Sequence, residues 1–452
     1  MQAEHTLERP VIYWRSTHFK VLLIVMMALR ITSYLTVFTS SAALTQVTKV
    51  LLRTLLTGTS IVLYYWLRKK YDERYVRIEY DNFFAAGLYV AYLLLGTASL
   101  LWTSSVSHTA LQLAMAWEGI VFAFLHFRLF VLYNALSGNH ANYALVLSRG
   151  VCIVSMAFII GMFVDPDNFF RDTHGGEVSR LGGYIVNPNE LGMLVVLGSA
   201  ASYVEMLRGK PKGFHIFNLI VCVTVLLLTQ SRSSLGAFML VTGIYILKSG
   251  NIKLQVLSVV GAIVVMPVLV QTIIVKQGDV EEVMSMTGRL PFWKDLLTDG
   301  FPRKPLLGYG FMRIANTERF HSIHSYPGKM THNTFMQVLM NLGLVGAWIA
   351  FLQIAATIRA IIRSRDRHLK LMASMMLIPV MINSFTEFGI FGEINYGILF
   401  YHNLIFIFVI RASTKKQRYE TTAFRRHPRL HQAFRVGVHA RTGVRTVAGR
   451  TA

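Results

Sequence analysis

Three arginines and one histidine have the residue types and surroundings that chemistry would need. Arg180 and Arg232 each lie in a polar turn next to an apolar run, and Arg289 lies in a longer polar and aromatic segment. A guanidinium group stays charged and can hold a phosphate through two parallel hydrogen bonds. A single arginine at the end of an apolar run more often anchors a helix at the membrane interface. Three of them together favour a site for a diphosphate.

His332 is the candidate general base. It stands beside Asn333 at the start of a long apolar run. Near neutral pH an imidazole can take a proton from an attacking hydroxyl. The alternative is a residue that only hydrogen-bonds backbone groups where a helix begins. Charged residues within a membrane segment often have a function. Four others fall within or near apolar runs, and the sequence assigns them no catalytic role: Arg30, Arg53, Glu118 and Glu387.

The sequence gives no support for a metal site, a nucleotide site or a disulfide. His321, His324 and His332 lie close together but lack the i, i+4 spacing of a helical zinc site. Cys152 and Cys222 both lie inside apolar runs. There is no P-loop, and no GxGxxG motif follows a strand. We therefore expect neither a metal nor a cofactor.

The elements that position these residues are predicted to be membrane helices. Of the 452 residues, 53% are hydrophobic and only 15% are charged, with a mean hydropathy of +0.46. This composition predicts an all-α polytopic membrane protein. Twelve apolar runs approach the length needed to cross a bilayer, near 21–38, 50–67, 83–102, 111–133, 143–164, 188–207, 214–230, 233–248, 254–275, 332–361, 371–388 and 394–411.

The charges between these runs predict how the chain is oriented. Lys and Arg concentrate in alternate loops, and the short loop 103–110 carries no Lys, Arg, Asp or Glu. Cytoplasmic loops collect Lys and Arg, so both termini are expected in the cytoplasm. The two long segments 165–187 and 276–331 then lie outside, and the larger precedes the tenth helix. Arg180, Arg289 and His332 fall on that outer side.

The chain divides into a transmembrane domain, 1–411, and a basic cytoplasmic tail, 412–452. The tail carries ten Lys or Arg against one acidic residue, Glu420, and shows no helical apolar stripe. We expect a disordered segment that lies on anionic lipid. The formal charge of +22 is explained by topology, so membrane lipids rather than nucleic acid are the expected partner of this charge.

These residues resemble the superfamily of bacterial O-antigen ligases and of O-antigen and exopolysaccharide polymerases. His332-Asn333 is followed by nine residues and then by Gly343-Leu344-Val345-Gly346, as in the ligases, although Ala347 departs from the Thr or Val expected next. Further matching motifs cover residues 180–350 closely: Asn187-Pro188-Asn189, Gln230-Ser231-Arg232, Thr287-Gly288-Arg289 with Trp293, and Pro305-Leu306-Leu307-Gly308-Tyr309-Gly310.

The resemblance implies a metal-independent glycosyltransferase of the GT-C type in the bacterial inner membrane, with its active site facing the periplasm. The donor would be a glycan on undecaprenyl diphosphate. By this analogy Arg180, Arg232 and Arg289 hold the departing diphosphate, and His332 orients or deprotonates the acceptor hydroxyl. Arg232 and Arg289 would share in catalysis with His332. The implied sugar-binding residues are Trp293, Tyr309, Asn187 and Asn189.

The acceptor is left open by the sequence. A polymerase would extend a lipid-linked glycan, a ligase would pass the glycan to lipid A-core, and a protein oligosaccharyltransferase would pass it to a protein hydroxyl. Asn187-Pro188-Asn189-Glu190 inclines us towards polymerisation, with chain-length and export proteins as possible partners. A transporter of lipid-linked glycans is the alternative of a different class. It would need polar residues through the bilayer, whereas polarity gathers at one face.

Overall fold

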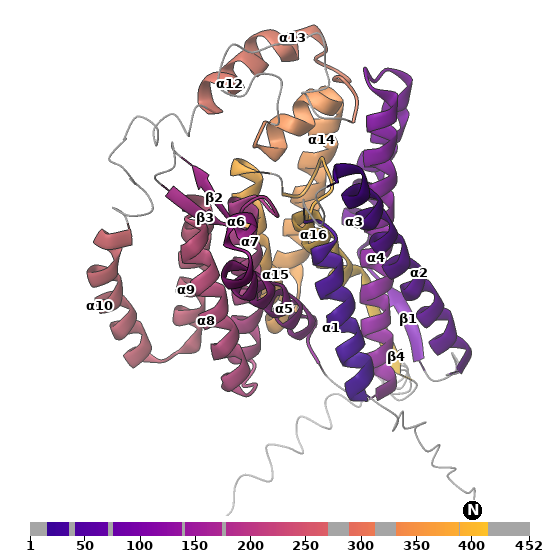
Figure 1. Cartoon of the computed structure of the whole chain (residues 1–452). Coiled ribbons are helices and arrows are strands. Elements are labelled where there is room, and N and C mark those ends of the chain that lie inside the picture. Colours follow the sequence, from indigo (N-terminus) through magenta and orange to yellow (C-terminus); the bar gives the residue numbers. More distant parts are fainter. Residues whose placement is uncertain are drawn as a thin grey trace, which may run out of the picture.

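The computed structural model describes most of the chain and confirms that it is mainly helical (Figure 1). The described residues are 16–35, 41–70, 76–137, 141–173, 178–269, 289–311, 331–387 and 389–414. Within them, twelve helices of fourteen residues or more occupy the twelve predicted regions: α1 (Ser16–Thr32), α2 (Ala42–Lys70), α3 (Phe83–Ala98), α4 (Val106–Ser137), α5 (Tyr143–Val164), α7 (Pro188–Leu207), α8 (Lys212–Thr229), α9 (Arg232–Ser249), α10 (Ile252–Leu269), α14 (Thr334–Arg363), α15 (Arg367–Thr386) and α16 (Tyr396–Val409).

Eight of these helices are long and apolar enough to cross a membrane. They are α2, α3 with the turn η1 (Ser99–Leu101) that continues it, α4, α5, α7, α8, α14 and α15, whereas α1, α9, α10 and α16 fall short in length or composition. The class of an all-α polytopic membrane protein is therefore supported. The number of helices that cross the bilayer, and the GT-C type, stay predictions.

Helices α7 and α16 form the centre of the bundle. Every residue of α16 is buried, and so is most of α7. Small residues let neighbouring helices approach α7 closely, as is usual between membrane helices. At Gly198, an added Cβ would lie only 2.5 Å from Cγ1 of Val151 in α5. Because α7 is packed on all sides, the residues at its N-terminus are held in fixed positions.

Two small antiparallel sheets were not predicted. Strand β1 (Val76–Tyr80) pairs with β4 (Ile410–Thr414), and β2 (Phe170–Thr173) pairs with β3 (Val178–Leu181). The alternation of Val76, Ile78 and Tyr80 with charged residues is a strand pattern that is easily missed between apolar helices. Strand β4 also crosses the predicted boundary at 411, so the first residues of the predicted tail are in a sheet. Residues 415–452 lie outside the described residues.

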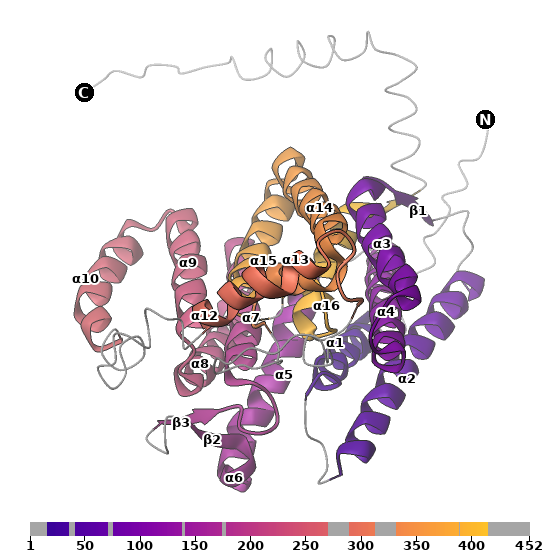
Figure 2. The ribbon, with the colours of Figure 1, turned by 90° about the horizontal axis from the view of Figure 1, so that it is seen from above.

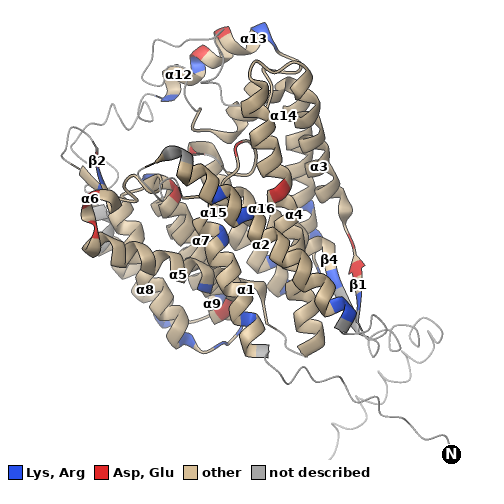
Figure 3. Cartoon of the chain, turned by 45° about the vertical axis from the view of Figure 1, so that its right-hand side comes forward, with Lys and Arg blue, Asp and Glu red and all other residues tan. Residues whose placement is uncertain are grey.

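The long predicted outer segments lie together at one end of the bundle. They contribute α6 (Pro166–Phe169), the β2–β3 hairpin, α12 (Arg289–Asp295), the π-helical turn η3 (Leu296–Gly300) and α13 (Phe301–Arg303). Figure 1 shows these elements at the end opposite β1 and β4, and Figure 2, seen from above, shows α12 and α13 in front of α15 and α16. Lys and Arg gather near β1 and β4, whereas the segment from α12 through η3 to α13 carries both signs (Figure 3). The two long segments that we predict on one side of the membrane therefore share one end of the bundle.

Candidate active site

The loop before α14 and a kink within α14 form one backbone unit. The amides of Tyr309 and Gly310 donate to the carbonyls of Met340 (2.9 Å) and Asn341 (2.8 Å). The φ angle of 60° at Gly343 breaks the helical geometry there, and a Cβ at this position would lie 2.3 Å from the carbonyl carbon of Leu306. The Gly308-Tyr309-Gly310 segment and the kink at Gly343 therefore pack directly against each other, which requires glycine at Gly343. This packing holds the first turns of α14 in place.

His332 lies where this helix begins. Asn333 caps α14, since its Oδ1 accepts from the amides of Phe335 (2.9 Å) and Met336 (3.0 Å). His332 itself has a left-handed backbone with φ 50°, which turns the chain sharply before the helix. Just before it, the carbonyl of Thr331 accepts from Nε1 of Trp293 at 2.7 Å. The backbone of His332 is thus fixed from both sides.

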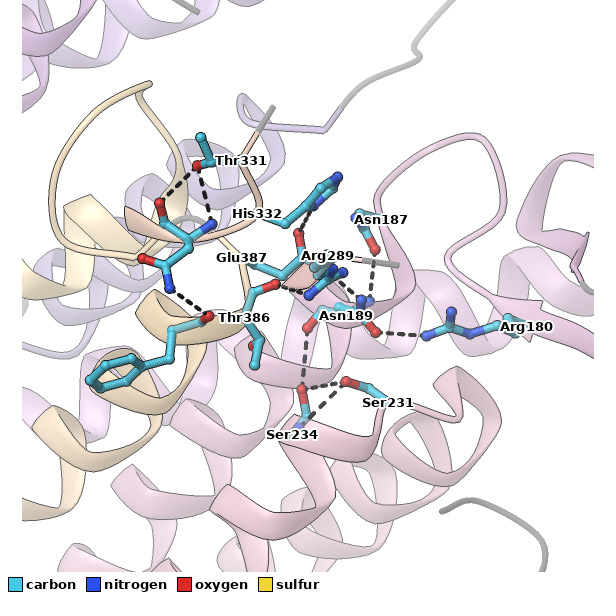
Figure 4. Close-up of polar contacts among 12 residues, drawn as sticks. Arg180, Asn187, Asn189, Ser231, Ser234, Arg289, Thr331, His332, Thr386 and Glu387 are labelled. Carbon is cyan, nitrogen blue, oxygen red and sulfur yellow. Dashed lines mark hydrogen bonds and ion pairs between the residues drawn. The ribbon is translucent and has the colours of Figure 1, made fainter. Parts of the chain in front are cut away.

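Glu387 joins the predicted site residues. It follows α15, and its side chain is only 1% exposed. Its Oε1 accepts from Nδ2 of Asn189 (2.7 Å) and from Nη2 of Arg289 (2.9 Å), and its Oε2 accepts from Nδ1 of His332 (2.7 Å), as Figure 4 shows. Nη1 of Arg289 also donates to the carbonyl of Thr386. One buried carboxylate therefore fixes both the candidate base and a candidate diphosphate ligand.

The charge state of Glu387 sets the tautomer of His332. Burial alone would raise the pKa of Glu387, but His332, Arg289 and the amide of Asn189 together lower it to about 2. An ionised carboxylate only accepts hydrogen bonds. In the neutral form of the ring, Nδ1 of His332 therefore carries the hydrogen, and the lone pair is on Nε2. This is the arrangement that a general base requires.

Arg180 is tied to the same network from the β2–β3 hairpin. Its Nε donates to the carbonyl of Thr229 (2.9 Å), and its Nη2 donates to Oδ1 of Asn189 (2.7 Å). Asn189 consequently bridges Arg180 and Glu387, with one amide atom used on each side (Figure 4). The network runs unbroken from Arg180 to His332.

The surroundings of Arg180 carry excess positive charge. Burial, followed by Arg171, Arg232 and Arg289, lowers the pKa of Arg180 to about 10, and only Glu387 acts in the opposite direction. Arg171 faces Arg180 directly across the hairpin register. Three further guanidinium groups thus act on Arg180 and one carboxylate opposes them, so an anion is attracted to this place.

Arg232 reaches this neighbourhood through the turn between α8 and α9. Gln230 has a left-handed backbone with φ 49°, and Ser231 caps α9 by accepting from the amide of Ser234 at 3.4 Å. The Oγ of Ser234 in turn donates to the carbonyl of Asn189 at 3.2 Å. The turn is therefore bonded to the start of α7, which brings Arg232, the first residue of α9, towards Arg180.

The predicted sugar-binding residues are not gathered into one sugar-facing set. Tyr309 is 3% exposed, its hydroxyl donates to the carbonyl of Gly300 at 2.7 Å, and its ring packs in a small buried cluster. Asn187 caps α7 by accepting from the amide of Asn189 at 3.0 Å. Both asparagine side chains are used within the protein. Trp293 is half-buried and keeps part of its ring accessible beside His332.

Sequence reasoning missed two residues of the site. Glu387 was recognised only as a charge near an apolar run, because its partners lie 55 to 198 positions away in the chain. Arg171 had no signal beyond its place in a polar segment. Among the described residues, no group of three His, Cys, Asp or Glu could hold a metal. His321 and His324 lie outside the described residues.

Comparison with known families gives one match. Residues 217–351 match the family model described as O-antigen ligase. The matched range begins in α8, ends in α14 and includes Arg232, Arg289 and His332, whereas Arg180 and Glu387 lie outside it. No curated protein matches the chain. The match supports the predicted resemblance to the O-antigen ligase and polymerase superfamily.

Proposed function

We propose that this member of the O-antigen ligase and polymerase superfamily transfers a glycan from undecaprenyl diphosphate to an acceptor sugar hydroxyl, at the periplasmic face of the bacterial inner membrane. The family supports glycan transfer of the ligase or polymerase type in general. The observation that carries the proposal is the link, through one ionised carboxylate, between His332 and the arginine cluster. A base for the acceptor and a ligand for the leaving group are held in one rigid unit.

The proposed reaction uses these residues in two roles. The acceptor oxygen attacks the anomeric carbon, while its proton passes to Nε2 of His332. The bond from the anomeric carbon to the diphosphate oxygen breaks, and the electron pair leaves with the diphosphate. The negative Glu387 stabilises the imidazolium that forms, as a carboxylate does beside a catalytic histidine.

The arginines stabilise the charge that develops on the leaving diphosphate. In the described part of the chain, Nε of Arg289 has no hydrogen-bond partner although it is buried. Arg180 uses Nε and Nη2 within the protein, which leaves Nη1 for a ligand. Donors placed in advance where charge develops often contribute more to catalysis than any other effect. Arg232 and Arg171 add to the attraction.

Polymerisation is the role that we favour, and ligation is the second candidate. The His-Asn and Gly-x-x-Gly spacing and the description of the matched family favour a ligase. Ala347 and the Asn187-Pro188-Asn189-Glu190 segment favour a polymerase.

Deletion of the gene followed by glycan analysis tests the proposal. For a polymerase we expect long chains to disappear while single repeats remain on lipid A. For a ligase we expect lipid A-core without glycan, and polymer left on the undecaprenyl carrier. The purified protein should also transfer glycan in detergent from a lipid-linked donor to an acceptor. Failure of this reaction, together with carrier-linked repeats trapped on the cytoplasmic side of the deleted strain, would support transport instead.

Substitution of Arg289 by lysine is expected to impair transfer severely. One ammonium group cannot hold the Thr386 carbonyl, the Glu387 carboxylate and a phosphate oxygen in the planar arrangement of a guanidinium. Loss of one such donor lowers turnover by about 10² to 10³. The measurement is the rate of transfer by the purified variant, with Arg303→Lys on the exposed helix α13 as the control. Full activity of Arg289→Lys would mean that a point charge is sufficient.

A further inference from the structure

A second site lies at the other end of the bundle, away from the candidate active site. A cavity of about 1080 Å³ is bounded by the end of α14, the starts of α15 and α3, and the end of α16. Helix α14 connects the two sites, since His332 precedes its first turn and Arg363 is its last residue. The part from Gly343 to Arg363 spans about 30 Å at 1.5 Å per residue. This is about the thickness of the hydrocarbon core of a bilayer, so the cavity lies at the opposite membrane interface.

Arginines dominate the polar wall of this cavity. Arg359, Arg363, Arg365 and Arg411 line it. In the described part of the chain, the side chains of the first three make no hydrogen bond or ion pair, whereas the side chain of Arg411 lies 3.5 Å from that of Asp81. Cations that share a cavity repel one another and attract an anion.

The one acidic residue of the lining is already used. Oδ1 of Asp366 accepts from the amides of His368 (2.8 Å) and Leu369 (3.1 Å) and so caps α15. Its position is set by the helix that it caps. The cavity therefore keeps a clear excess of positive charge.

The other wall is apolar. It includes Phe84, Ala85, Ala356, Ile407 and Phe408. Phe84 is 70% exposed at the start of α3, where a membrane helix would meet lipid. A small hydrophilic anion would leave this wall unused, whereas an anion that carries an acyl chain would cover it.

We propose that this cavity binds a phospholipid with a net negative headgroup. The guanidinium groups of Arg359, Arg363 and Arg365 hold the phosphate, and an acyl chain lies along Phe84, Ala356 and Ala360. Basic pockets between membrane helices are known to hold such headgroups. The segment that follows Arg411 cannot take this place favourably, because it carries ten Lys or Arg against Glu420 alone and would be repelled. This inference does not depend on the glycan transfer proposed above.

Lipid titration on the purified full-length protein tests the proposal. Phosphatidylglycerol or phosphatidylcholine is added to the protein in detergent, and bound lipid is measured by native mass spectrometry. The variant R359Q/R363Q/R365Q is compared with K210Q/K212Q/K253Q, which removes the same charge at the same end of the bundle but outside the cavity. We expect about fivefold weaker binding of phosphatidylglycerol per arginine removed, on the order of a hundredfold in total. The control K210Q/K212Q/K253Q should bind phosphatidylglycerol almost as the unmodified protein does.

Two further measurements keep the result interpretable. The variant R359K/R363K/R365K keeps the charge and should bind within a few-fold of the unmodified protein. Thermal unfolding followed by circular dichroism checks that each variant is folded. Equal loss in the two glutamine variants, or equal binding of phosphatidylcholine, would overturn the proposal. If inorganic phosphate alone raised the thermal unfolding temperature as much as phosphatidylglycerol does, the cavity would be assigned to a free anion instead.

Discussion

Replacing His332 with alanine is expected to abolish detectable glycan transfer while leaving membrane insertion intact. The imidazole is the group placed to take the proton from the acceptor, and removal of a general base lowers a rate by about 10² to 10⁴. Its ring is 19% exposed, so its loss leaves no large buried cavity. The measurements are the length and abundance of the polymer in cells and the rate of transfer by the purified protein.

The backbone at His332 calls for two companion variants. With φ at 50°, alanine is strained there, whereas asparagine and glycine adopt this conformation readily. His332→Asn should therefore fold as the unmodified protein does and still be inactive. His332→Gly should be inactive alone and should regain part of its activity when imidazole is added to the assay, because the added base can occupy the vacated space.

A matched histidine variant completes this test. His368 is exposed near the start of α15, at the end of the bundle away from the site. It contacts Asp366 through its backbone amide and not through its ring. His368→Ala should transfer glycan at the normal rate. Polymer of normal length and amount in cells that carry His332→Ala or His332→Asn would remove the assignment of His332 as the base.

Hydropathy predicted the helical frame well, because it is a local property. Each of the twelve predicted helices has a counterpart, but α2 begins at Ala42 rather than near 50. Polar residues such as Gln46 and Lys49 precede the apolar run there and were assigned to a loop. Helical hydrogen bonding extends beyond the apolar stretch, which is why helix ends are the least certain part of such a prediction.

The candidate site was only partly predictable for a different reason. Arg180, Arg289 and His332 were identified from their local surroundings, and they prove to be joined through Asn189 and Glu387. Asn189 was predicted only as a sugar ligand and Glu387 only as a charge near an apolar run, since their joining role comes from contacts between distant elements.

Tyr309 shows the opposite error. An aromatic residue in a glycine-rich segment suggests a sugar platform, but its ring is buried. Burial depends on tertiary packing, which spacing in the sequence does not reveal.

Substitution of Glu387 by glutamine is expected to lower turnover nearly as much as loss of His332. The carboxylate accepts two hydrogen bonds at Oε1 and one at Oε2. A glutamine would best keep its oxygen where Asn189 and Arg289 both donate, which places its NH₂ group against Nδ1 of His332. That nitrogen must then accept, so the hydrogen moves to Nε2 and the base is lost. A wrong tautomer of this kind lowers turnover by about 10⁴ in a histidine–carboxylate pair.

The pH dependence of stability distinguishes this explanation from simple misfolding. The pKa of Glu387 is about 2 in the folded protein against an ordinary value of 4.5. Because the folded pKa is the lower one, the ionised group stabilises the fold above pH 4.5, and this contribution, on the order of 3 kcal/mol, is lost as the pH falls towards 2. Glu387→Gln cannot titrate, so thermal unfolding of the variant should depend less on pH across this window.

Two controls decide how a loss of activity in Glu387→Gln is to be understood. Glu387→Asp keeps the charge and the correct tautomer of His332 at a longer distance, so it should retain more activity than the glutamine variant. Glu393→Gln alters another carboxylate, one that accepts from Gln112 at 2.9 Å, and should leave transfer unchanged. If Glu387→Gln transfers glycan at the normal rate, then His332 does not need the carboxylate to act as a base. The network would in that case only hold the elements of the site together.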